Sequence, residues 1–581
     1  MHKSQHVMTF PPCYSFLMQD YVWQFLNDSE IKNKEDIIKV VLKNRQIEDV
    51  SEFLNPKTPF EFIKNDKEMV ALIKEHVIPA KKLILEAIKK GQEIIIHGDY
   101  DVDGQTATAI LWKTIYEDLG YKNVKPFIPN RFDDGYGLSI KSLANIGATL
   151  SKRAGQALAR PALLITVDCG IVSIDEVLEA KKLGFTVIIT DHHESHKNLP
   201  KADEIIHTTN ATGAGIAWVL ANELSPETSI KKLGLAALGT ICDLQPLIGF
   251  NRSIVKHGLL ELNLNMPIGI NALSQIAGIK EKIGEYEAGW QIGPRLNATG
   301  RMEDAMDSLR LLSTNSMEQA IILAKKLNSI NTQRQDKTIS DTFSAIQEIE
   351  KENSDGVIKN FIVTSSTNYH EGIIGLVAGK LTQKYHRPGI AIAINEKEDI
   401  AKGSARSISG ISIVDVLRKF NELFEGLGGH EMAAGFSIKP SNIPLLKEKL
   451  YSLNDWPSEI FNKTLKIDAI LDTNLISLDS LNEINNLKPF GAGNFEPVFC
   501  IKNITVTNFS RFGKENDHLK LFLEDKNHNQ FTGLAFGKGN LSNSLKNGQT
   551  TDIVFNLSQN TWNEKTTIEI KIKDLKKSID G

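Results

Sequence analysis

Three apolar runs in the first half of the chain each end in acids and histidines. The first is Ile94-Ile95-Ile96-His97 with Asp99, Asp101 and Asp103 behind it, the second is 163–167 with Asp168, and the third is 187–190 with Asp191-His192-His193. The carboxyl ends of neighbouring parallel strands meet at one edge of a sheet, where open α/β folds place ligands. Carboxylates mixed with imidazole suit a divalent cation, and several together suit a pair. The three runs therefore predict a metal site at a sheet edge.

The first acidic cluster also matches the opening of a calcium-binding EF-hand loop, Asp99-x-Asp101-x-Asp103-Gly104. A calcium loop needs a bidentate Glu at its twelfth position, where this chain has Ile110, and it follows a helix instead of an apolar strand. Residues 105–119 contain no Gly or Pro and carry apolar residues at helical spacing. The cluster is therefore expected to be a strand-to-helix turn, and calcium is excluded.

Four motifs in order along the chain resemble those of the DHH phosphoesterase superfamily. They are His97-x-x-x-Asp101-x-Asp103, Asp168, Asp191-His192-His193, and Asp243 in Cys242-Asp243-Leu244-Gln245-Pro246. In the second half, residues 369–379, 402–407 and 428–435 resemble the DHHA1 domain, and residues 489–499 resemble the entry to the OB domain of the bacterial RecJ family. The likeness runs from about Phe53 to about Phe536. One departure is Phe495, where the family usually has Pro, and it lies outside the expected metal site.

The resemblance implies a set of ligands for two ions, Mn²⁺ or Mg²⁺. His97, Asp101 and Asp168 would hold one cation, while Asp103, Asp168, His192 and Asp243 would hold the other, with Asp168 as the bridge. Asp99 and Asp191 would orient ligands, and His193 would face the scissile phosphate. Two cations about 3.5 to 4 Å apart can activate a water and stabilise the leaving oxygen of a phosphoryl displacement. Imidazole favours manganese in affinity, although magnesium is more abundant in cells.

Arginine side chains are expected to bind the phosphates of the substrate. Arg131, Arg295, Arg301 and the nearby Asn297 follow short turns, where Arg can contact phosphate bidentately, although any one of these arginines could instead form a surface salt bridge. By resemblance, Ser404 and Arg406 bind a terminal 5′-phosphate and His430 faces the same cleft. Aromatic and basic side chains that suit a single strand lie in the C-terminal segment, at Phe509, Arg511, Phe512, Lys514, His518 and Lys520.

The chain is expected to be a multidomain α/β protein. We expect an N-terminal helical extension over 1–66, a parallel-sheet DHH domain over 67–310, a connecting helix over 311–355, a DHHA1 α/β domain over 356–456 and an OB-type β-barrel over 457–581. Alternating strands and helices indicate the parallel sheet, and short β-runs with turn signals indicate the barrel. Residues 316–355 contain neither Gly nor Pro, so they form one long helix or two abutting ones. The structure of the Ala-, Ser- and Lys-rich insert 146–160 is open.

Bulk properties limit the function classes. A net charge of −4 excludes a protein that coats nucleic acid by overall charge, so any DNA contact must be a local basic groove. The cysteines, Cys13, Cys169, Cys242 and Cys500, show no paired spacing, which is typical of a reducing cytosol. No apolar stretch approaches the ~18 residues of a membrane span, and no signal-peptide core is present.

The expected function is that of a cytoplasmic, monomeric, metal-dependent exonuclease. It would degrade single-stranded DNA from the 5′ end to mononucleotides in recombination and repair. A single-strand-binding protein and a helicase are candidate partners. Two alternatives stay open: a DHH hydrolase of short oligonucleotides or cyclic dinucleotides, and a nuclease-dead binding scaffold. The apparent OB barrel disfavours the first, since a tiny substrate needs no long groove, and the complete set of ligands disfavours the second.

Overall fold

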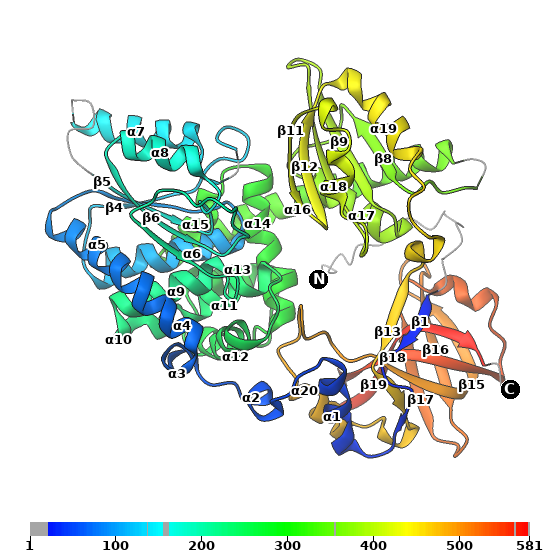
Figure 1. Cartoon of the computed structure of the whole chain (residues 1–581). Coiled ribbons are helices and arrows are strands. Elements are labelled where there is room, and N and C mark those ends of the chain that lie inside the picture. The colour runs from blue at the N-terminus through cyan, green and yellow to red at the C-terminus, as the bar shows by residue number, and fades with distance from the viewer. Residues whose placement is uncertain (1–20, 136, 155–161, 354–355, 563–564, 579–581) are drawn as a thin grey trace. The chain divides into compact units, whose positions relative to one another are not determined.

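The structure is a computed structural model that describes residues 21–135, 137–154, 162–353, 356–562 and 565–578. Cys13, the first part of the expected N-terminal extension and residues 155–160 of the insert lie outside the described residues. The chain forms two compact units (Figure 1). One runs from Pro56 to Phe461, and the other combines the chain up to Asn55 with the chain from Asn462 onward.

The first half of the larger unit is built on a parallel sheet of five strands in the order β4-β3-β5-β6-β7. The strands are β3 (Ile94–His97), β4 (Val124–Phe127), β5 (Ala162–Val167), β6 (Phe185–Asp191) and β7 (Glu204–His207). Alternate residues face two separate cores: Ile94 and Ile96 belong to one, and Ile95 to the other. Burial on both faces explains why these strands are continuous apolar runs.

Helices cover both faces of this sheet (Figure 1). The helices α7 (Ile140–Ala154) and α8 (Ile174–Lys182) lie on one side, and α5 (Ile78–Lys89), α6 (Val102–Lys113), α9 (Gly213–Leu224) and α11 (Leu233–Cys242) lie on the other. The helix α7 accounts for the insert up to Ala154. On the α6 side, α9 and α11 are buried almost throughout. This buried layer places the starts of α6 and α9 against the strand ends.

A long helix leads from this region to the next. After α14 (Gly293–Met302) and α15 (Met306–Ser313), α16 runs without interruption over Met317–Glu352. Its 36 residues correspond to about 54 Å at the usual rise per residue. Residues 317–352 therefore form one long helix and not two abutting ones. Because α14 and α17 (Ile374–Tyr385) both pack against α16, this helix contacts elements of both α/β regions.

The second α/β region has a five-stranded sheet in the order β11-β12-β10-β9-β8. Its strands are β8 (Ile362–Ser366), β9 (Gly389–Asn395), β10 (Ile400–Arg406), β11 (Phe424–His430) and β12 (Ala433–Ile438). Only β8 and β9 pair in parallel, and the other neighbours are antiparallel. The helices α17, α18 (Ile413–Arg418) and α19 (Ile443–Tyr451) complete the region. The strands expected at 361–364 and 389–394 are confirmed to within two residues.

The smaller unit contains a closed barrel. Five strands close through an additional pairing of β15 with β16, and they are β15 (Phe499–Phe512), β16 (His518–Glu524), β17 (Gln530–Ala535), β18 (Gln549–Trp562) and β19 (Lys565–Lys577). The expected fold class, α/β regions followed by an OB-type barrel, is confirmed. Three short helices, α1 (Lys34–Asn44), α2 (Val50–Leu54) and α20 (Leu478–Asn485), belong to the same unit.

The described start of the chain differs from the expected helical extension. Strand β1 (Val22–Phe25) pairs in parallel with β13 (Thr464–Ile467), and β2 (Glu30–Ile31) pairs with β14 (Ala469–Leu471). Trp23 and Phe25 alternate with the more exposed Val22 and Gln24 and pack beside Ile467, Cys500 and Val554, so they cover the barrel and not a helical core. The helix α3 (Pro59–Asn65) belongs to the larger unit instead. A strand whose partner lies more than 400 residues away has no local signature.

Candidate metal centre and nucleic-acid interface

The expected strand-end residues meet at one edge of the parallel sheet. His97 closes β3 and pairs with Thr166, Asp168 follows β5, and Asp191 closes β6. His192 comes next. Because the three strands are parallel neighbours, their carboxyl ends deliver these side chains to the same place. Asp168, Asp191 and His192 are all nearly inaccessible to solvent.

The two acids of the first motif are fixed by helix starts. Asp101 caps α6, and its Oδ1 accepts a hydrogen bond from the Gly104 amide at 3.0 Å. Asp103, in the first turn of α6, accepts from the amides of Gly213 at 2.7 Å and Ala214 at 2.9 Å, at the start of α9. Two helix N-termini therefore hold these carboxylates in place, as expected from the helix dipole. A Cβ on Gly213 would lie 2.6 Å from the Asp168 Cβ, so only glycine permits this approach.

His192 lies at the centre of the carboxylates. Its Nε2 is 3.1 Å from Asp168 Oδ1 and 3.7 Å from both Asp103 Oδ2 and Asp243 Oδ2. Both ring nitrogens of His192, one oxygen of Asp168 and one oxygen of Asp243 are buried without a hydrogen-bond partner. Buried polar atoms without partners are costly, so several aimed at one point indicate a missing ligand. A divalent cation bound by oxygen and imidazole nitrogen fits this set.

Electrostatics at the site also favours cations. Burial, followed by the charge of Asp101, raises the pKa of Asp103 to about 7, and burial followed by the charge of Asp103 raises that of Asp243 to about 8. Burial and four neighbouring carboxylates raise the pKa of Asp168 well above its usual value. The pKa of His192 falls to about 4, chiefly through burial. A neutral imidazole among crowded carboxylates is the protonation state that a metal requires.

Asp168 also carries backbone strain. Its φ is +62°, in the left-handed region that non-glycine residues rarely adopt. Leu244, directly after Asp243, has the same φ and is largely exposed. Such outliers persist only where the surrounding structure holds them, and they cluster at functional sites. Here one outlier is the expected ligand Asp168, and the other, Leu244, directly follows the expected ligand Asp243.

The surroundings of His97 and Asp99 bear on which of them holds the first cation. His97 Nε2 lies 3.2 Å from Ser142 Oγ and its Nδ1 lies 3.8 Å from Cys169 Sγ, so both ring nitrogens have other neighbours. Asp99 instead groups with Asp101 and Asp168, with ligand atoms within 4.8 Å of one another. Burial, then Asp101, raises the pKa of Asp99 to about 8. The geometry favours Asp99 over His97 as a ligand of the first cation.

Asp191 organises the pair of histidines after it. Its carboxylate accepts hydrogen bonds from the amides of Ile171, His192 and His193, and its Oδ1 lies 2.8 Å from His193 Nδ1. This contact raises the pKa of His193 to about 9, against the opposing effect of burial. Asp191 thus orients the histidines, the role expected for it. His193 also groups with Asp168 and His192 as a possible ligand.

The expected substrate residues of the first half lie close together. Arg131 stacks over the Tyr100 ring at 4.9 Å. Arg295 donates to Asn328 Oδ1 at 2.9 Å and to the Gln291 carbonyl at 2.7 Å. Asn297 accepts from the Val102 amide at 3.2 Å, which ties α14 to the start of α6 and gives Asn297 a structural contact. For Arg301, burial and then the charges of Arg131, Arg334 and Arg406 lower the pKa to about 10.

Ser404, Arg406 and His430 share one face at the end of the second sheet. Arg406 and His430 both lie opposite Ala433 of β12, so their side chains point to the same side. Arg406 donates to Ser404 Oγ at 3.3 Å. A Cβ on Gly375, in the first turn of α17, would lie 3.2 Å from an Arg406 nitrogen, so the helix start adjoins the guanidinium. Gly428 and Gly435 face open space beside them.

The barrel residues predicted to bind the single strand differ in how much of the side chain is exposed. Phe509 is half-buried and packs against the barrel core, which favours a structural role. Arg511 is exposed, and its guanidinium donates to Ser542 at 2.6 Å and Asn543 at 2.7 Å. Two other residues predicted for this role, Phe512 and His518, form an aromatic surface together with Phe536, and the ring centroids lie 5.1 to 5.8 Å apart. Phe536, 53% exposed, was not named from sequence because the ring cluster comes from three strands or turns.

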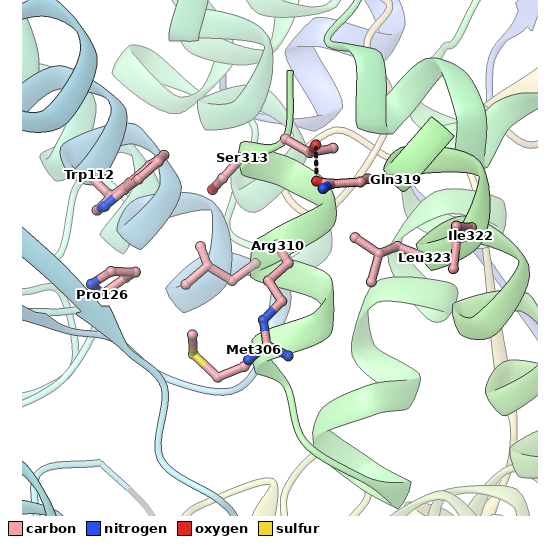
Figure 2. Close-up of a pocket in the computed structure, with 10 residues that line it drawn as sticks. Trp112, Pro126, Met306, Arg310, Ser313, Gln319, Ile322 and Leu323 are labelled. Atoms are coloured by element: carbon pink, nitrogen blue, oxygen red, sulfur yellow. Dashed lines mark hydrogen bonds between the residues drawn. The ribbon is translucent and has the colours of Figure 1, made fainter. Parts of the chain in front are cut away.

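A separate pocket of about 530 Å³ lies between α6, β4, α15 and α16. Figure 2 shows Trp112 and Pro126 on one side, facing Met306 and Arg310, with Leu323 and Ile322 beyond them. None of the expected ligands lines it. Its single charged side chain, Arg310, is paired with Asp307 at 2.5 Å. The pocket therefore contributes no group to the metal centre.

The parallel sheet with its edge of carboxylates and imidazoles, joined to a second α/β region, places the protein in the DHH class. Family models agree: the DHH family N-terminal domain matches 93–240, the DHHA1 domain 359–454 and the RecJ OB domain 467–574. The chain belongs to the RecJ family.

Curated relatives support that assignment. The chain is 34% identical to the single-stranded-DNA-specific exonuclease RecJ of Bacillus subtilis over 84% of its own length and 62% of that protein. It is 32% identical to the exonuclease of the same name from Haemophilus influenzae, over 80% of this chain and 85% of that one. The chain thus spans somewhat under two thirds of the Bacillus protein and most of the Haemophilus one.

Solved structures agree as well. The crystal structure of Thermus thermophilus RecJ in complex with Mn²⁺ matches with a TM-score of 0.78 at 27% identity, covering 97% of this chain and 80% of that one. The same protein in complex with Mg²⁺ matches with a TM-score of 0.72 at 26% identity, over 96% and 79%. Both metals expected from the sequence thus occur in structures of this fold. Among the described residues, no helix is long and apolar enough to cross a membrane.

Proposed function

We propose that this protein is a metal-dependent exonuclease that degrades single-stranded DNA from its 5′ end to 5′-mononucleotides, in DNA recombination and repair. The observation that carries the proposal is the group of unpartnered buried atoms on Asp168, His192 and Asp243, at the edge of the sheet. The names of the relatives, single-stranded-DNA-specific exonucleases, support the substrate.

The residues present fit two cations, Mn²⁺ or Mg²⁺. Asp103, Asp168, His192 and Asp243 would hold one, and Asp101 and Asp168, with Asp99 or His97, would hold the other. When bound, the cations would supply an activated water and charge stabilisation for the leaving oxygen. The protein itself orients the site: Asp191 fixes both histidines, and two helix starts fix Asp101 and Asp103.

His193 is proposed to bind the scissile phosphate and not a metal ion. Against the lowering effect of burial, the hydrogen bond and charge of Asp191, with the charges of Asp99 and Asp243, raise the pKa of His193 to about 9, which favours the protonated ring. A cationic imidazole beside the metal ligands can donate a charge-assisted hydrogen bond to a phosphate oxygen. It would therefore hold the scissile phosphate and stabilise charge that develops during cleavage.

The second α/β region is proposed to select the 5′ end. Ser404, Arg406 and His430 share one face, bordered by the start of α17 and by glycines that leave space for a ligand. An arginine, a hydroxyl and free backbone amides are the groups that bind phosphate. A terminal 5′-phosphate held there would set the polarity, and the aromatic surface of the barrel would hold the strand further along.

A degradation time course tests the proposal. The substrates are a long single strand labelled at either end, the matching duplex and a dinucleotide, each with Mn²⁺. We expect immediate release of labelled mononucleotide from the 5′-labelled strand and a shrinking ladder from the 3′-labelled one. Faster cleavage of the dinucleotide would indicate a hydrolase of short oligonucleotides, and binding without cleavage would indicate a scaffold. Monomeric state, cytoplasmic location, and partnership with a single-strand-binding protein or a helicase stay predictions.

A further inference from the structure

Arg334 lies on the inward stripe of the long helix α16. Leu327, Asn331, Thr338 and Asp341, three to four residues apart, are buried along this stripe, and Arg334 falls within it. Its Nε is buried without a hydrogen-bond partner. An arginine that faces inward on a helix normally donates to an acid or a carbonyl.

The groups around Arg334 are cationic. Burial, followed by the charge of Arg295, lowers its pKa. Burial, followed by the charges of Arg131, Arg334 and Arg406, lowers the pKa of Arg301. The five arginines come from the segment after β4, from α14, from α16 and from β10, so they gather where both α/β regions adjoin α16. The name "arginine cluster" is used below for Arg131, Arg295, Arg301, Arg334 and Arg406.

No carboxylate among the described residues forms a salt bridge with any member of the arginine cluster. The lysines of the same helix behave differently. Lys326 pairs with Asp307 at 2.6 Å and with Glu303 at 3.2 Å, and Lys337 pairs with Asp341 at 2.8 Å. Gathered cations that form no salt bridge repel one another and do not stabilise the fold. Their arrangement is instead suited to an anion that arrives from outside.

Arg295 is held ready for such a ligand. Its Nε donates to Asn328 of α16 and one terminal nitrogen donates to the Gln291 carbonyl. A guanidinium has five N–H donors, so about three remain for a ligand. Asn328 precedes Arg334 by about 1.7 turns on the same helix. The helix therefore both positions one arginine and contributes another.

We propose that Arg334, together with Arg295, binds an internal phosphodiester of the single strand, so that α16 is part of the substrate groove and not only a connector. This rests on the proposed function. The subsite differs from the terminal-phosphate pocket on β10, because Arg295 donates to Asn328 on the helix that carries Arg334, whereas Arg406 donates to Ser404 Oγ. The ligand is recognised as a backbone phosphate, so no base preference is expected.

The test compares Arg334→Gln and Arg334→Lys with Lys326→Gln in the full chain. Lys326 is a matched control because it lies on the same helix, exposed and already paired with acids. Binding of fluorescein-labelled (dT)20 is measured by anisotropy against KCl concentration, and KM and kcat are measured with Mn²⁺. We expect Arg334→Gln to raise KM about 10- to 100-fold with kcat within about threefold. The slope of log affinity against log salt should fall by about 0.7, the value for one phosphate contact to a single strand.

A second measurement locates the phosphate. (dT)20 strands with one neutral methylphosphonate at each successive linkage are compared for binding. We expect one linkage to weaken wild type and Lys326→Gln but to leave Arg334→Gln unaffected, with Arg334→Lys in between because lysine keeps the charge and loses the planar fork. The melting temperature of Arg334→Gln should equal or exceed that of wild type, because a repelling charge is removed. A lower melting temperature with an unchanged interference profile would show a structural arginine and overturn the inference.

The two proposals fail in different ways. If wild type degrades the strand and Arg334→Gln matches it in salt slope and interference profile, the subsite is wrong and the exonuclease stands. If wild type binds (dT)20 without degrading it, the exonuclease proposal fails. The salt dependence of binding and the methylphosphonate interference profile then still test the subsite. If wild type does not bind (dT)20, both are wrong.

Discussion

Asp168 offers the sharpest test of the metal centre, through two substitutions that differ in backbone strain. Its φ of +62° suits asparagine, which tolerates the left-handed region, better than alanine, for which that region costs about 1 to 2 kcal/mol. Asp168→Asn keeps the size of the side chain and removes its charge. Asp168→Ala removes the charge and adds the strain. The two variants therefore separate the electrostatic effect from the backbone effect.

The expected magnitudes follow from the surroundings of Asp168. Burial and the charges of Asp103, Asp101, Asp99 and Asp243 raise its pKa. Two like charges 4 Å apart repel by about 4 kcal/mol at an effective dielectric constant of 20, and protonation relieves part of this in metal-free protein. Asp168→Asn should therefore be more stable than wild type without metal, by about 1 kcal/mol at pH 8.5, and Asp168→Ala about 1 to 2 kcal/mol less stable than Asp168→Asn. Both should lose at least ~1000-fold in turnover, equal to about 4 kcal/mol of barrier.

Urea denaturation in EDTA at pH 8.5 measures the stabilities, and release of mononucleotide from a long single strand with Mn²⁺ measures turnover. Added Mn²⁺ should stabilise wild type and leave both variants nearly unchanged. Turnover of either variant within about tenfold of wild type, roughly 1.4 kcal/mol, would refute a bridging role for Asp168. Equal stability of the two variants would refute the strain argument alone.

Four further predictions follow from the structure. Arg406→Ala should reduce the preference for 5′-phosphate over 5′-hydroxyl ends in competition assays, and an unchanged preference would place the end pocket elsewhere. Phe536→Ala should weaken binding of long strands about 5- to 100-fold without changing turnover at saturation, since stacking is worth about 1 to 3 kcal/mol per base, whereas Phe509→Ala should mainly lower the melting temperature. Asp191→Asn should lower the pKa of His193 below about 9, so that kcat declines from a lower pH than in wild type; an unshifted pH profile would contradict the role of His193. Metal-free wild type should lose stability between pH 6.5 and 9, because its buried carboxyls keep protons up to about pH 7 to 8 that the unfolded chain releases near pH 4, and Mn²⁺ should remove this loss.

The pH window in the last of these has a physical reason. A carboxyl with a raised pKa stabilises the folded state at low pH and loses that contribution as the pH rises through the folded value. His192 has a pKa lowered to about 4, so below about pH 6.5 the unfolded chain takes up a proton that the folded protein does not. Its contribution to stability therefore rises with pH up to about 6.5. Above pH 6.5 the His192 term is constant, while His193, with its pKa raised to about 9, adds a contribution that falls as the pH rises toward 9.

The parallel sheet and most of the metal centre could be predicted from sequence because their signals are local. Apolar runs of four to seven residues followed at once by acids and histidines define strands with functional ends. The strand-end rule then brings Asp101, Asp168 and His192 together without any knowledge of the packing. Helical structure at 316–355 could also be predicted because no Gly or Pro interrupts it, but the sequence does not decide between one helix and two.

Other features depend on contacts between distant segments. The surroundings of His97 depend on Ser142 and Cys169, which contact its imidazole. Strand β1 forms only because β13 offers it an edge. A deletion of the barrel beginning near Trp456 would therefore also leave Val22–Phe25 without its partner, so the substitution at Phe536 tests the barrel more cleanly. Phe509 has the residue type of a stacking platform, but its packing in the barrel core is a tertiary property.

The arginine cluster resolves an apparent conflict between charge and substrate. A chain with a net charge of −4 cannot attract a polyanion by its overall field. The structure separates the charges instead: carboxylates gather at the sheet edge, where cations can neutralise them, and arginines without acids gather beside α16. A single strand can then contact bound cations at one phosphate and arginines at others. Because screening acts over about 8 to 10 Å at physiological salt, such a local arrangement determines binding more than the net charge does.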